Sequence, residues 1–135
     1  MNKNIKRSKK NFSNKGRYEA YLGNMVYFAS NAIADRYLQL VKLQENKRII
    51  ELEINPQFSI VVHNKRLGSF NANFRYFTLE DNNHRGYCVV ENIKNIQTDL
   101  YKLKKQLVEL SLSMQIHDIP AEEIKEWTDR IPLNQ

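Results

Sequence analysis

Cysteine, glycine and long hydrophobic runs are scarce in this chain of 135 residues, and each scarcity excludes a class of protein. A single cysteine, Cys88, cannot build an intramolecular disulfide framework or a cysteine-based zinc site. The four glycines form no phosphate-binding loop, which disfavours nucleotide hydrolysis. No apolar run approaches the roughly 20 residues of a membrane-spanning helix. Three histidines fall in different predicted elements, so we predict no metal site and no cofactor.

Acidic residues are absent from the first 17 positions, where seven basic residues lie: Lys3, Lys6, Arg7, Lys9, Lys10, Lys15 and Arg17. The remaining 118 residues carry 14 basic and 15 acidic side chains, so the net charge of +6 comes entirely from this segment. Few apolar groups accompany the cations, which predicts a basic disordered arm over 1–17 and a single α+β domain over 18–135. No apolar block of a secretory signal follows the first cations, so a cytoplasmic protein is expected.

The basic arm is the feature with the most direct functional interpretation. Clustered Lys and Arg side chains neutralise phosphates and release counterions, whereas the alternative is an unstructured end that only keeps the protein soluble. Aromatic rings among the cations suit base stacking. We therefore predict an RNA or DNA interface of nine residues: Lys3, Lys6, Arg7, Lys9, Lys10, Phe12, Lys15, Arg17 and Tyr18.

Hydrophobic spacing predicts the elements of the domain. Apolar residues recur at helical spacing from Tyr18 to about Asn46, which predicts a long N-terminal helix. Alternating segments at 50–54, 58–62, 70–76 and 87–91 predict a four-stranded antiparallel meander, with a turn at EDNNHRG before the last strand. Asp118 is expected to cap a short C-terminal helix that includes Trp127 and ends at Pro132.

The clearest pattern is a heptad stripe, whose members are spaced alternately three and four residues apart: Ile93, Ile96, Leu100, Leu103, Leu107, Leu110 and Met114. It predicts a second long helix, with Asn92 as its N-cap. Such a stripe packs either inside one domain or against a second copy of the chain. We favour packing within the domain and a monomer, with a coiled-coil dimer as the alternative.

Catalytic chemistry has little support in the sequence, so no catalytic residue and no enzymatic activity are predicted. Cys88 lies in a predicted strand as a small hydrophobic residue, and no histidine or acid is tied to it by a motif. Two other places suit a partner. Arg75 and Tyr76 lie in an aromatic strand, and Trp127 lies on a short apolar helix face that either docks onto the domain or anchors a partner.

The segment KRSKKNFSNKGRYEAY, from Lys6 to Tyr21, resembles the N-terminal stretch of a broad-spectrum type II-A anti-CRISPR protein, a phage-encoded Cas9 inhibitor. The resemblance implies a non-enzymatic phage or mobile-element protein, in the cytoplasm of a host bacterium, whose basic arm blocks a nuclease–RNA complex. It singles out Lys6, Arg7, Lys9, Lys10, Phe12, Lys15 and Arg17. The alternative is a general RNA- or DNA-binding accessory protein, such as a ribosome-associated or replication factor. The residues leave open which step would be inhibited.

Overall fold

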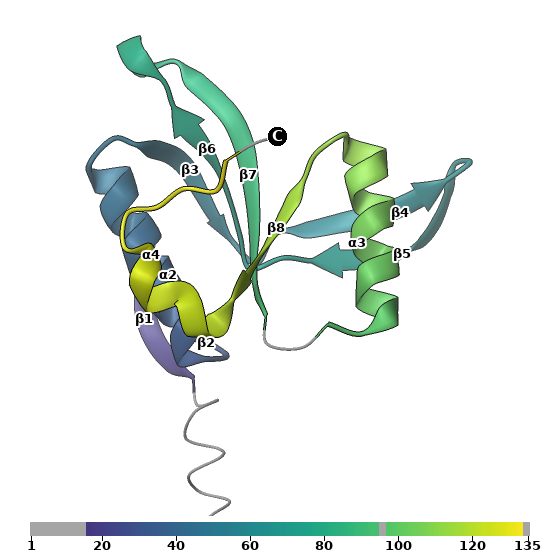
Figure 1. Ribbon diagram of the computed structural model, residues 1–135, viewed down its shortest axis with the longest axis horizontal. Helices are drawn as coiled ribbons and strands as arrows, with labels where there is room; N and C mark the ends of the chain where they lie inside the picture. Colours follow the sequence, from purple (N-terminus) through teal and green to yellow (C-terminus); the bar gives the residue numbers. More distant parts are fainter. Residues whose placement is uncertain (1–15, 95–96, 134–135) are drawn as a thin grey trace, which may run out of the picture.

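The computed structural model describes residues 16–94 and 97–133, which form an α+β fold of eight strands and three short α-helices (Figure 1). In chain order the elements are β1 (Arg17–Tyr21), β2 (Asn24–Phe28), α2 (Asn31–Glu45), β3 (Ile49–Ile54), β4 (Gln57–Val62), β5 (Lys65–Asn71), β6 (Phe74–Leu79), η1 (Asp81–Asn83), β7 (Arg85–Lys94), α3 (Asp99–Leu112), β8 (Ile116–Pro120), η2 (Ala121–Glu123) and α4 (Ile124–Trp127). None of the helices in these ranges has the length and apolar character needed to span a membrane.

The prediction of one long helix from Tyr18 to about Asn46 is wrong in its first half. Residues 17–28 form the antiparallel hairpin β1–β2, and Leu22 and Gly23 turn its chain at φ values of 49° and 83°. The segment is rich in Tyr, Val and Phe, which favour strands, and its alternation buries Phe28 on one face. Helix α2 begins after Ser30, whose hydroxyl oxygen accepts a hydrogen bond from the Ile33 N–H.

The predicted four-stranded antiparallel meander is also wrong. The main sheet has the order β3-β6-β7-β8, in which β8 runs parallel to β7, and β4 pairs only with β5. Asn55, at a φ of 53°, and Pro56, which has no N–H for a ladder, turn the chain out of the sheet after β3. The Asn55 N–H donates a hydrogen bond to the Asn73 carbonyl, and the Ala72 N–H donates one to the Pro56 carbonyl. These two bonds close the base of the β4–β5 hairpin.

The heptad stripe does not form one helix, because its described members fall in β7, in α3 and, for Met114, after the end of α3. Ile93 lies in β7, Ile96 lies outside the described residues, and α3 holds only the stretch from Asp99 to Leu112. Thr98 caps α3 by accepting a hydrogen bond from the Tyr101 N–H. The predicted cap, Asn92, is instead buried in β7, where its side-chain oxygen accepts from the Asn73 N–H.

The C-terminal prediction also needs a correction. Asp118 lies in β8 and does not cap a helix, because its carboxylate accepts hydrogen bonds from Tyr101, Lys105 and Gln97. The helical segment that follows is short, with η2 leading directly into α4. Helix α3 thus connects the parallel pair β7 and β8, which is the crossover that parallel strands require.

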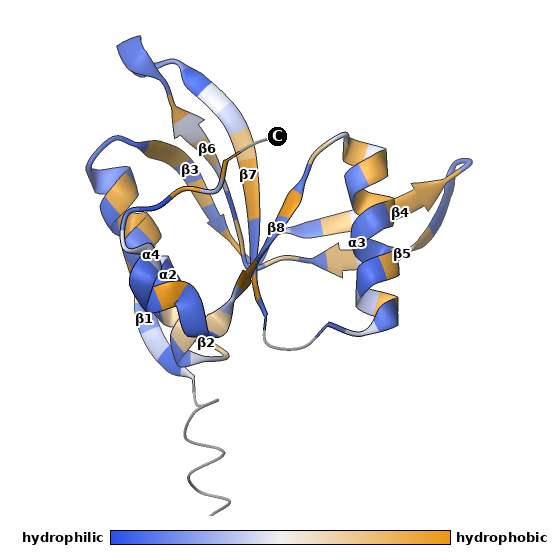
Figure 2. Ribbon diagram, in the orientation of Figure 1, coloured by the Kyte–Doolittle hydropathy of each residue, from blue (hydrophilic) through white to orange (hydrophobic). Residues whose placement is uncertain are grey.

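The two faces of the sheet bury separate hydrophobic clusters. Val89, on one face of β7, belongs to the cluster under α2 and α4, while its neighbour Val90 belongs to the cluster under α3 and β4–β5. Figure 1 shows these groups of elements on opposite sides of the sheet. Figure 2 shows apolar positions along β7 and β4 and a mixture of apolar and polar positions along α3. The hairpin β1–β2 therefore sits on the opposite side of the sheet from α3.

Candidate nucleic-acid interface

The hairpin β1–β2 presents one face to α2 and the other to solvent. On the inner face Phe28 is buried, and its ring stacks on the ring of Tyr37 at a centroid distance of 4.8 Å. The Tyr37 hydroxyl donates a hydrogen bond to the Ala20 carbonyl, which ties the hairpin backbone to α2. The position of the hairpin is therefore fixed by packing on the helix that follows it.

The outer face of the hairpin carries two exposed tyrosines. Tyr18 and Tyr27 are directly opposite each other in the strand pairing and expose 62% and 52% of their surface. Their rings meet edge to face at a centroid distance of 5.2 Å. The next pair on the same face, Ala20 and Met25, is also exposed. We call Tyr18, Ala20, Met25 and Tyr27 the outer hairpin face. An exposed aromatic pair of this kind offers ring faces and edges to planar ligands.

Gly16 joins the outer hairpin face to the segment before it. A Cβ atom at Gly16 would lie 2.0 Å from the Phe28 carbonyl oxygen and 2.6 Å from the Tyr27 hydroxyl oxygen. Only a residue without a side chain fits this close approach of the backbone to the ring. The chain therefore enters the fold directly beside Tyr27, and the basic segment of the sequence ends next to the aromatic pair.

Most of the predicted nucleic-acid-binding residues lie outside the described residues, namely Lys3, Lys6, Arg7, Lys9, Lys10, Phe12 and Lys15. Tyr18 is on the outer hairpin face. Arg17 faces the other way, and its guanidinium contacts Glu19 and Asp35 at 2.7 and 2.6 Å. The hydrogen bond that Arg17 donates to Glu19 is the main cause that raises the pKa of Arg17. Arg17 therefore anchors the hairpin to α2, and its charge is already balanced by two carboxylates.

The two predicted partner residues of β6 differ in their burial. Tyr76 is fully buried, and its hydroxyl donates to the Glu91 carboxylate. Burial raises the pKa of Tyr76 well above its ordinary value. Arg75 is half-buried, pairs with Glu53 and lies over the Phe58 ring at 5.5 Å. Tyr76 is therefore a core residue, and Arg75 binds within its own fold.

Trp127 docks onto the domain, as the first of its two predicted roles requires. Its half-buried ring packs against the cluster under α2, and the guanidinium groups of Arg36 and Arg130 lie over the ring at 5.1 and 4.7 Å from its centroid. The ring nitrogen is buried and has no hydrogen-bond partner among residues 16–94 and 97–133. The contact with Arg36 joins α4 to α2, and the contact with Arg130 joins it to the C-terminal segment.

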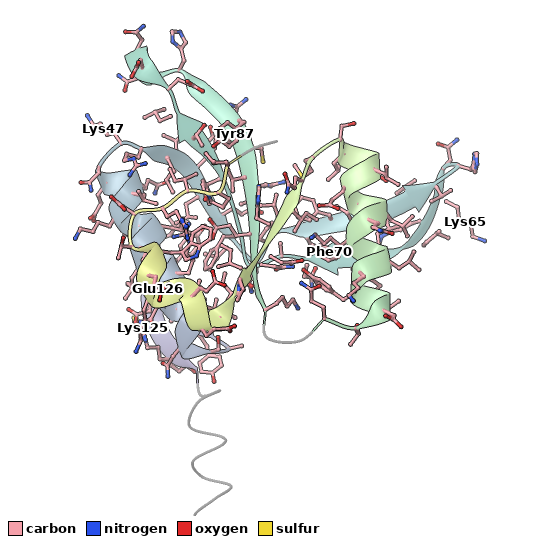
Figure 3. All side chains as sticks on the ribbon, viewed as in Figure 1. Lys47, Lys65, Phe70, Tyr87, Lys125 and Glu126 are labelled. Atoms are coloured by element: carbon pink, nitrogen blue, oxygen red, sulfur yellow. The ribbon has the colours of Figure 1, made fainter. Side chains whose placement is uncertain are left out.

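A polar cluster between α3 and β8 escaped the sequence analysis. The Tyr101 hydroxyl donates to Asp118 and accepts from the Asn92 side-chain nitrogen at 2.7 Å, while Lys105 lies 2.9 Å from the same carboxylate. Burial is the main cause that raises the pKa of Tyr101, and the hydrogen bond to Asp118 adds to it. Beside this cluster the Tyr101 ring contacts the ring of Phe70, at a centroid distance of 5.4 Å (Figure 3). The cluster ties α3 to the sheet.

Side chains that could bind a metal ion do not converge in the described ranges. No set of three or more His, Cys, Asp or Glu side chains converges there. Cys88 is half-buried in β7, and burial raises the pKa of its thiol, which opposes thiolate chemistry. The outer hairpin face is thus the surface whose chemistry agrees best with the basic segment beside it.

Comparison of the chain with protein families, with characterised proteins and with solved structures finds no match.

Proposed function

We propose that this protein binds single-stranded nucleic acid through its basic N-terminal segment together with the outer hairpin face. The observation that carries the proposal is the exposed Tyr18–Tyr27 pair, which lies where seven clustered cations of the sequence meet the fold. Cations neutralise the phosphates, and tyrosine rings stack on bases without regard to sequence. Because such contacts position a strand and read no base edge, binding should show little sequence selectivity.

The magnitudes follow from the two kinds of contact. Six cations, at positions 3 to 15, remain once Arg17 is assigned to its carboxylates. If all six meet phosphates of a single strand, the logarithm of the association constant falls with the logarithm of salt with a slope of about −4. Stacking contributes about 1–3 kcal/mol per base, so loss of one tyrosine ring should weaken binding by about fivefold or more.

The test is a salt titration of binding to a labelled single-stranded RNA, followed by fluorescence anisotropy. A full-length variant with alanine at positions 3, 6, 7, 9, 10 and 15 should lose both affinity and salt dependence. Tyr18→Ala should lose affinity and keep the slope. Lys65→Ala with Arg66→Ala is the matched charge control, because both residues are exposed at the far end of the β4–β5 hairpin (Figure 3). Unchanged affinity in the six-alanine variant would show that the segment only keeps the protein soluble.

We further propose that the nucleic acid is part of a nuclease–RNA complex, which the protein inhibits without enzymatic activity. The similarity of residues 6–21 to a type II-A anti-CRISPR protein supports this role. A DNA mimic would be acidic, whereas this segment is basic, so contact with guide RNA agrees better with its charge.

A Cas9 cleavage assay with purified protein, alongside a pull-down from host lysate with and without ribonuclease, tests the inhibitor role. The six-alanine variant should fail to inhibit. Undiminished cleavage at saturating wild-type protein, with ribosomal or bulk RNA recovered in the pull-down, would contradict the inhibitor role. That outcome would favour an RNA-binding accessory protein and leave the binding interface itself in place.

A further inference from the structure

Helix α3 carries a row of four leucines, three of which its own domain leaves exposed. Leu100, Leu103 and Leu110 expose 61%, 54% and 79% of their surface, and Leu107, between them, is only partly buried. The four positions follow the spacing 3-4-3, which places them along one side of the helix. We call these four residues the leucine stripe.

Most of the leucine stripe lies away from the face by which α3 packs on its domain. Val108 belongs to the cluster under the β4–β5 hairpin and Tyr101 packs against it, and of the four leucines only Leu107 also reaches this cluster. At 3.6 residues per turn, two residues that are two positions apart point about 160° away from each other around the helix axis. Leu103 therefore points away from Tyr101, and Leu110 points away from Val108. Helix α3 therefore has apolar side chains on two sides, and packing inside the domain buries mainly those on one side.

We propose that the leucine stripe binds the same stripe of a second copy of this chain, so that two α3 helices pair across a two-fold axis. Alternation of three and four residues is the spacing at which leucines of two helices interlock as knobs into holes. A two-fold interface joins one surface to itself, so a stripe of a single residue type is self-complementary. The stripe is rimmed by Asp99, Gln106 and Lys104, as a small interface is rimmed by polar groups.

Charges beside the stripe select the parallel orientation. With Leu100 and Leu107 at the a positions, Asp99 occupies a g position and Lys104 the e position that follows it. In a parallel pair the g residue of one helix faces that e residue of the other, so two Asp–Lys contacts form across the axis. In an antiparallel pair g faces g and e faces e, and these opposite charges do not meet. Other occupants, such as an apolar helix of a different protein, would not require this pairing.

The mass in solution tests the interface. Light scattering of the full chain over a range of concentrations should reach twice 16.0 kDa for the wild type. Leu103→Lys with Leu110→Lys should restore 16.0 kDa, while the circular dichroism spectrum stays that of the wild type. The matched control is Leu133→Lys, because Leu133 exposes 79% of its surface, as Leu110 does, and lies outside α3. A wild-type mass of 16.0 kDa at every concentration, or a double variant that stays dimeric, overturns the proposal.

Cross-linking tests the orientation without risk to the core. In the parallel pair Leu103 faces Leu103 of the second copy, whereas in the antiparallel pair it faces Leu107. Leu103→Cys should therefore form a disulfide-linked dimer under mild oxidation, and the wild type, whose one cysteine is the half-buried Cys88, should not. Lys104→Glu should weaken the dimer, and Asp99→Lys in addition should restore it. A dimer that neither cross-links at position 103 nor responds to these charges refutes the parallel pair.

Discussion

The buried ion pair between Arg36 and Glu91 makes the most demanding prediction about stability. Both side chains are 0% exposed. Two guanidinium nitrogens of Arg36 donate to the two carboxylate oxygens of Glu91 at 2.7 Å each, and a further bond of 2.7 Å reaches the Arg130 carbonyl. Burial lowers the pKa of Arg36, but the hydrogen bond and charge of Glu91 outweigh it and raise the pKa overall. The pair joins α2, β7 and the C-terminal segment.

Arg36→Met removes the cation while keeping most of the apolar length of the side chain. It leaves Glu91 as a buried carboxylate with the Tyr76 hydroxyl as its remaining hydrogen-bond donor among the described contacts. Breaking a buried pair from one side costs about 3–5 kcal/mol, because the other charge stays without compensation. For a domain of this size each kcal/mol lowers the melting temperature by about 3–6 °C, so we expect a fall of about 9–30 °C.

Thermal and urea unfolding, followed by circular dichroism, measure the effect in a double-mutant cycle. Arg36→Met with Glu91→Leu should be more stable than Arg36→Met alone, since both charges are then gone and similar volume is retained. The control is Arg75→Met, which breaks the more exposed pair with Glu53 and should cost at most about 1 kcal/mol. Additive effects of the two substitutions at 36 and 91 would show that the pair is not coupled and would refute the reasoning.

Two further predictions concern the C-terminal segment and pH. Trp127→Ala should lower the free energy of unfolding by about 2 kcal/mol, which is roughly half the cost for a fully buried ring, because the indole contacts both Arg36 and Arg130. An unchanged melting temperature would contradict docking of Trp127 onto the domain. Burial lowers the pKa of His117 below its ordinary value of 6.5, although the nearby Glu91 opposes the shift. Below about pH 6.5 the unfolded chain therefore binds a proton that the folded chain does not, and stability should fall as the pH is lowered. His117→Gln should reduce the difference between urea midpoints at pH 7.5 and 5.5, and an unaltered difference would contradict this assignment.

Local patterns in the sequence predict where the strands lie better than they predict which strands pair. Alternation located the strand that became β7, and the turn before it agrees with η1. It could not show that β3 pairs with β6 across an inserted hairpin, because that pairing is set by contacts far apart in the chain. Pro56 interrupts the alternation of apolar residues in the sequence, but only the tertiary structure shows that the chain leaves the sheet there.

Prediction of the candidate site from the sequence is limited in the same way, because the site depends on which strands pair. The place of Tyr18 beside the cations predicts it as a binding residue, whereas the prediction of one helix from Tyr18 to about Asn46 gives no reason to select Tyr27. Helical and strand periods coincide over a stretch this short, and the residue types Tyr, Val and Phe were the signal that favoured a hairpin. The spacing of the leucine stripe predicts a helix, but the sequence cannot show that Tyr101 and Val108 face the domain. It therefore cannot show that Leu100, Leu103 and Leu110 stay exposed.

The two surfaces proposed here are physically independent, because they lie on opposite sides of the sheet. The hairpin β1–β2 packs on α2 through its inner face, and α3 packs on β4–β5 (Figure 1). Pairing through α3 would therefore leave the outer hairpin face of each copy exposed. Two such faces on one assembly raise the effective concentration of the second contact once the first has formed. Weak, salt-dependent contacts on each copy would then add up on a long strand, whereas a short strand that reaches only one copy would gain nothing from the pairing.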